Sequence, residues 1–82
     1  MHESGIVEDL IGQLEKVSRA NGGGRVLRVE LGMGMGAGFS REHLEEHFRA
    51  ASAATIAEGA VLAIRNTEGD ALTLEAVEMD ET

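Results

Sequence analysis

The chain of 82 residues contains no cysteine, no tryptophan and no tyrosine, and two phenylalanines are its only aromatic residues. Without thiols, it can form neither a disulfide nor a thiolate-based zinc or iron–sulfur site. Without several aromatic rings, it lacks the platform on which bases of single-stranded nucleic acid stack. The core must therefore be built from Val, Ile, Leu, Ala and Met.

Positive charge is also scarce, because seven Lys and Arg residues face fifteen Asp and Glu residues, for a formal net charge of −8. Such a surface repels phosphate, so we expect no nucleic acid and no anionic membrane among the partners. It suits metal cations and basic protein surfaces. The sequence also lacks an apolar run long enough to span a bilayer and the N-terminal pattern of a secretory signal, so a cytoplasmic location is expected.

Hydrophobic periodicity predicts a first helix that starts near the N-terminus. Ser4 is the expected N-cap, and the run "NGGG" (21–24) is expected to end the helix. Apolar residues recur at spacings of three and four, which is typical of one buried helix face. The members of this stripe are Ile6, Val7, Leu10, Ile11, Leu14 and Val17.

The segment "RVLRVEL" (25–31) alternates apolar and charged residues, which is typical of a strand with one buried face. Its apolar face is expected to carry Leu27, Val29 and Leu31. The run "GMGMGAG" (32–38) has glycine at every second position. Because glycine has low helix and strand propensity, we expect a loop there.

Ser40 is expected to cap a second helix over 41–54, followed by strands over 61–64 and 71–79 that form an antiparallel hairpin. The buried stripe of this helix is predicted to be Leu44, Phe48 and Ala51. The order α-β-α-β-β predicts one small α/β (α+β) domain over 1–82, in which two helices cover a three-stranded mixed sheet. An exposed edge strand of such a sheet would also permit a homodimer.

Two short motifs offer alternative sites. "GMGMGA" (32–37) matches the dinucleotide-binding pattern, with Glu58 near the position of a ribose-binding acid, but the chain is too small for that fold. "HLEEH" places His43 and His47 on one helix face, where they could chelate a divalent ion. The same string, with Glu46, matches an inverted metalloprotease signature, although no third ligand is visible.

The N-terminus itself is a third candidate. The amine of Met1, the amide nitrogen of His2 and the His2 imidazole can form adjacent chelate rings on one ion. Ni(II) and Cu(II) favour such square-planar nitrogen fields. Glu3 can add a carboxylate or a further backbone nitrogen. This chemistry predicts a metal site at Met1, His2 and Glu3.

The sequence as a whole resembles the HypA/HybF family of nickel metallochaperones. "MHE" leads directly into an amphipathic helix and "RVLRVEL", and "ATIAEGAVLAI" (54–64) is similar to a family segment of the type "GTxAEGAxLxI". The resemblance implies delivery of Ni(II) to the large subunit of [NiFe] hydrogenase or to urease, with a nickel-handling GTPase as partner. Carried over by position, the family's nickel site also falls on Met1, His2 and Glu3.

The chain departs from the family pattern where members carry a zinc domain with two C-x-x-C pairs. Here the turn "NTEGD" (66–70) stands at that place, so we expect no zinc-binding domain and no structural zinc. The sequence thus predicts a metallochaperone, not an enzyme, with Ni(II) as cargo. The alternative is a HypA-like scaffold that has lost metal delivery.

Overall fold

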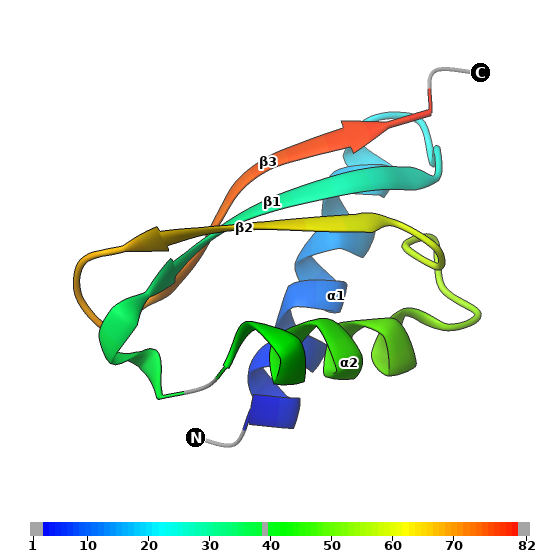
Figure 1. Ribbon diagram of the computed structural model, residues 1–82. Helices are drawn as coiled ribbons and strands as arrows, with labels where there is room; N and C mark the ends of the chain where they lie inside the picture. Colours follow the sequence, from blue (N-terminus) through cyan, green and yellow to red (C-terminus); the bar gives the residue numbers. More distant parts are fainter. Residues whose placement is uncertain (1–2, 39, 81–82) are drawn as a thin grey trace.

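The computed structural model describes residues 3–38 and 40–80 and contains two α-helices, three strands and one turn of 3-10 helix (Figure 1). The predicted order α-β-α-β-β is confirmed. The elements are α1 (Glu3–Ala20), β1 (Val26–Gly34), η1 (Met35–Ala37), α2 (Arg41–Ser52), β2 (Val61–Thr67) and β3 (Leu72–Met79).

The strands form a mixed sheet in the order β2-β1-β3. Strand β1 pairs in parallel with β2 and antiparallel with β3, so Val29 lies between Leu62 and Val77. The mixed sheet was predicted correctly, but the predicted hairpin between the last two strands is wrong. Placing β1 in the centre satisfies backbone groups on both of its edges and buries its apolar residues in the middle of the domain.

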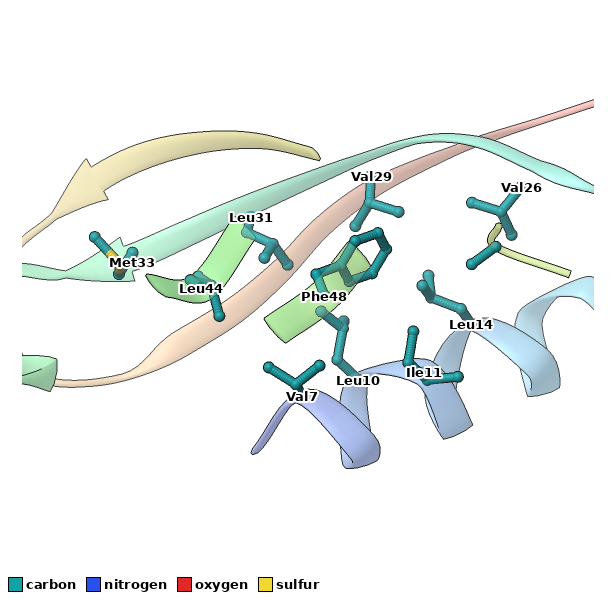
Figure 2. Close-up of a cluster of buried hydrophobic side chains, with 11 residues drawn as sticks. Val7, Leu10, Ile11, Leu14, Val26, Val29, Leu31, Met33, Leu44 and Phe48 are labelled. Carbon is teal, nitrogen blue, oxygen red and sulfur yellow. The ribbon is translucent and has the colours of Figure 1, made fainter. Parts of the chain in front are cut away.

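Both helices lie on the same face of the sheet and pack against each other (Figure 1). The core lies between this helical layer and β1, and Phe48 projects between β1 and α1 (Figure 2). Ile6, Val17 and Ala51, which were predicted to be buried, are only half-buried. The buried apolar residues are Val7, Leu10, Ile11, Leu14, Val26, Val29, Leu31, Met33, Leu44, Phe48 and Ala57.

The two predicted N-caps have different outcomes. Helix α1 already begins at Glu3, so Ser4 is the second residue of the helix and not the residue before it, where the prediction placed it. Ser40 does cap α2, because its hydroxyl accepts a hydrogen bond from the His43 backbone N–H at 3.1 Å. The "NGGG" run ends α1 as predicted, and the Gly23 N–H donates to the Ser18 carbonyl at 2.7 Å.

A bulge in β1 changes which residues face the helices. The register of β1 against β3 shifts between Val26 and Arg28. As a result Val26 and Val29 are both buried, whereas Leu27 is 44% exposed. The predicted position of Leu27 on the apolar face is therefore wrong, because an extra residue in a strand reverses the alternation of faces on one side of it.

The glycine run is not the predicted loop. Gly32, Met33 and Gly34 belong to β1, and η1 follows directly. A Cβ at Gly34 would lie 2.6 Å from the carbonyl oxygen of Gly69, and the Gly36 N–H donates to that oxygen at 2.8 Å. The glycines thus let the turn between β2 and β3 cross close to the end of the central strand.

Candidate metal centre

The predicted nickel ligands, Met1, His2 and Glu3, come in the sequence just before α1 and at its first residue. Met1 and His2 are outside the described residues, as is the side chain of Glu3. The backbone of Glu3 opens the helix. Of the predicted site, the structure thus shows only that the backbone of Glu3 is already helical.

Helix α1 is anchored to the core from its second turn onward. Val7 is 1% exposed, Leu10 5% and Leu14 0%. Each such side chain stabilises the packed helix by roughly 1.5–3 kcal/mol relative to an exposed one. Because Val7 follows Glu3 by four residues, one helical turn separates the predicted site from the core.

An open groove of about 640 Å³ runs between the N-terminal half of α1 and α2. Figure 1 shows these two helical segments crossing next to each other. From α1 the groove is lined by Val7 and Glu8, and α2 contributes two histidines and a carboxylate. The lining residues of α2 are His43, Glu46, His47, Ala50 and Ala51.

Glu8 is a member of this groove that the sequence did not indicate. Its proximity to α2 depends on how the two helices cross, and no local signal reports that. Within residues 3–38 and 40–80, no three His, Cys, Asp or Glu side chains are placed to hold a metal together. The described residues therefore do not assemble the three-ligand site of a metalloprotease around His43, Glu46 and His47.

A dinucleotide-binding site would require the glycine run and Glu58 to lie close together. They lie instead at opposite ends of the central strand. The Glu58 carbonyl accepts a hydrogen bond from the Arg25 guanidinium at 2.9 Å, beside the start of β1. Gly34 lies at the opposite end of that strand, in register with Thr67 at the end of β2. This arrangement provides no glycine loop that leads into a helix N-terminus beside the acid.

The face of the sheet away from the helices carries an ion pair between Arg65 and Glu75. Arg65 Nε donates to Glu75 Oε1 at 3.2 Å, and a second bond joins Nη2 to Oε2. Hydrogen bonding to the guanidinium, together with its charge, lowers the pKa of Glu75, and the same contacts raise the pKa of Arg65.

Neither helix among the described residues is long and apolar enough to cross a bilayer.

Comparison with known proteins identifies the family of this chain. A family model described as "Hydrogenase/urease nickel incorporation, metallochaperone, hypA" matches residues 1–76. The chain belongs to the HypA family. The resemblance of its N-terminus and of the segment 54–64 to that family is thereby confirmed, and the family is one of nickel metallochaperones for hydrogenase maturation.

Curated relatives are longer than this chain. The hydrogenase maturation factor HypA of Chlorobium limicola is 42% identical over 64 residues, which cover 78% of this chain and 55% of that protein. HypA of Xanthobacter autotrophicus is 33% identical over 78 residues, or 95% of this chain and 69% of its own length. The chain thus spans between 55% and 69% of these HypA relatives.

A solved structure supports the fold. The solution structure of the Ni metallochaperone HypA from Helicobacter pylori superimposes with a TM-score of 0.73 at 19% sequence identity, covering 93% of this chain and 72% of that one. At this identity the likeness shows the fold alone. The small α+β domain with its mixed sheet is therefore an arrangement shared with a HypA protein.

Proposed function

We propose that this chain is a nickel-binding metallochaperone that takes up Ni(II) at Met1, His2 and Glu3 and supports its insertion into [NiFe] hydrogenase or another nickel enzyme. Family membership supports the role, since the matching family is described by nickel incorporation. The observation that carries the site is that α1 begins at Glu3 and is fixed to the core by Val7. A helix that is fixed to the core one turn after Glu3 supports a site at the residues that lead into it.

The chemistry follows from the donor set. An amine, a deprotonated backbone amide and an imidazole form a nitrogen field that suits Ni(II). Each of these donors must lose a proton or be neutral to bind, so binding is linked to proton release. Few side-chain ligands give a moderate affinity, which lets an acceptor remove the cargo. Metal transfer of this kind makes and breaks only coordination bonds, so the protein is proposed not to be an enzyme.

The proposed partners are a nickel-handling GTPase and the hydrogenase large subunit, in the cytoplasm. The relatives carry the name hydrogenase maturation factor, which supports this setting. The whole chain, 1–82, is proposed to be a HypA-like nickel-binding domain without a zinc-binding domain. Because the chain has no cysteine, it would use no thiolate-held structural zinc. A homodimer through an edge strand stays a prediction.

Calorimetric titration of the untagged protein with Ni(II), beside His2→Ala, tests the proposal. One tightly bound nickel per wild-type chain and at least tenfold weaker binding by the variant are expected, with unchanged circular dichroism. A short N-terminal extension before Met1 is a matched control, because it converts the amine into an amide and should weaken binding as much. Equal tight binding by all three proteins would overturn the site, whereas no nickel binding by wild type would favour the alternative of a scaffold that has lost metal delivery.

A further inference from the structure

Helix α2 presents two histidines in fixed positions. It begins after the Ser40 cap and is regular from Arg41 to Ser52, so His43 and His47 are one turn apart. Leu44 and Phe48, their neighbours in sequence, are 0% and 3% exposed. Because these two side chains are held in the core, the orientation of α2 about its own axis is fixed. The two exposed histidine positions are therefore set relative to α1.

The groove that receives these histidines is acidic. Both line it together with Glu46 of the same helix and Glu8 of α1. No three such side chains among the described residues are placed for one ion, so we treat the carboxylates only as nearby negative charge. A groove of this size also leaves room for water. Charge and solvent access together favour a hydrated cation.

We propose that His43 and His47 form a second metal site, which binds a divalent transition-metal ion such as Ni(II) through two imidazoles, with water in the remaining positions. Residues four apart on a helix have Cβ atoms about 5–6 Å apart, which lets both rings reach one ion. Imidazole suits Ni(II), Cu(II) and Zn(II), whereas Mg(II) and Ca(II) prefer oxygen. With two protein ligands, this site is weaker than the N-terminal one.

The site adjoins the first turns of α1, since Val7 and Glu8 line the same groove. A weak imidazole site there would raise the local nickel concentration beside the first turns of α1. The binding itself does not depend on the function proposed above, because its ligands are on α2 alone.

Ni(II) titration of the untagged protein in a His2→Ala background tests this site, with calorimetry as the readout. One residual, weaker nickel per chain is expected. Adding His43→Ala and His47→Ala should lower that residual affinity at least tenfold. Residual binding that survives both changes, or a His2→Ala protein that binds no nickel at all, would overturn the proposal.

A composition-matched control separates chelation from general charge. The double variant Glu45→His with His47→Glu keeps the number of histidines and the net charge but spaces the imidazoles two residues apart. Residues two apart do not face each other on a helix, so this variant in the His2→Ala background should bind as weakly as the alanine variant. Affinity equal to that of the His2→Ala parent would refute the chelate. Variants with His2 intact should keep the tighter nickel, so the two proposals fail independently.

Discussion

Arg65 of β2 and Glu75 of β3 pair with each other across the central strand, above Gly32. Gly32 is in register with Arg65 on β2, and a Cβ at Gly32 would lie 2.8 Å from Glu75 Oε2. A side chain at this position would therefore occupy the space through which the two edge strands make contact. The pair links β2 to β3, which are not neighbouring strands in the order β2-β1-β3.

The pair predicts a pH dependence of stability. The contacts with Arg65 lower the pKa of Glu75 below its ordinary value of 4.5. A carboxyl group with a lowered folded-state pKa contributes stability that is present above its unfolded pKa and lost as the pH falls through the folded one. From neutral pH down through 4.5 and below, the free energy of unfolding of wild type should therefore fall more steeply than that of Glu75→Gln. Urea unfolding at a series of pH values measures both curves.

The variant Glu78→Gln removes a carboxylate from the same strand and leaves the Arg65–Glu75 pair intact. It controls for the general loss of negative charge from an acidic protein. If wild type and Glu75→Gln show parallel curves through the acid range, the cross-sheet pair contributes nothing to folding.

Gly34→Ala should destabilise the domain. Its new Cβ would lie 2.6 Å from the backbone oxygen of Gly69 and 2.9 Å from the backbone nitrogen of Ala71, and backbone atoms cannot rotate away. Overpacking of this kind costs about 1–3 kcal/mol. Chemical unfolding should show a loss in this range.

Gly12→Ala is the matched control, because the added methyl group meets nothing within 4 Å in α1. Alanine is favoured over glycine inside a helix by up to about 1 kcal/mol, so this variant should be more stable than wild type. Equal effects of the two substitutions would contradict the close crossing of the turn over the end of β1.

Phe48→Ala should remove much of the stability of the domain. The ring is 3% exposed and packs between α2, β1 and α1 (Figure 2). Truncating such a ring costs about 3–5 kcal/mol, a large share of the 5–15 kcal/mol that is usual for native proteins. Thermal unfolding measures the loss, and Val61→Ala, at a side chain that is 55% exposed, should be close to neutral. A small effect at Phe48 would mean that α2 is not fixed by this contact.

Features that depend on neighbours in the sequence were predictable. The stripe from Ile6 to Val17 shows the period of a helix, and four of its six members are buried. The Ser40 cap needs only a hydroxyl three residues before a backbone N–H, and it forms. Family membership was also predicted from local strings, "MHE" and "ATIAEGAVLAI" (54–64), and the HypA family model matches residues 1–76.

Features that depend on which distant segments meet were not predictable. The turn signal at 66–70 is typical of a hairpin, yet β2 and β3 both pair with β1. Gly32 and Gly34 have low strand propensity, yet both lie in the central strand. A Cβ at Gly32 would collide with Glu75 of the Arg65–Glu75 pair, and a Cβ at Gly34 would collide with the backbone of Gly69. Local propensity is a weak preference of a fraction of a kcal/mol, and these contacts outweigh it.

The sequence by itself determined the order of the elements, the apolar stripe of α1, the cap of α2, the family and the chemistry expected of Met1, His2 and Glu3. Periodicity, capping and chelate spacing are all local properties of a chain. Only the tertiary structure decided that β1 is central and that Glu8 joins His43 and His47 in one groove. Those relationships depend on the packing of α1 and α2 on one face of the sheet, which buries the core most completely and which no single segment encodes.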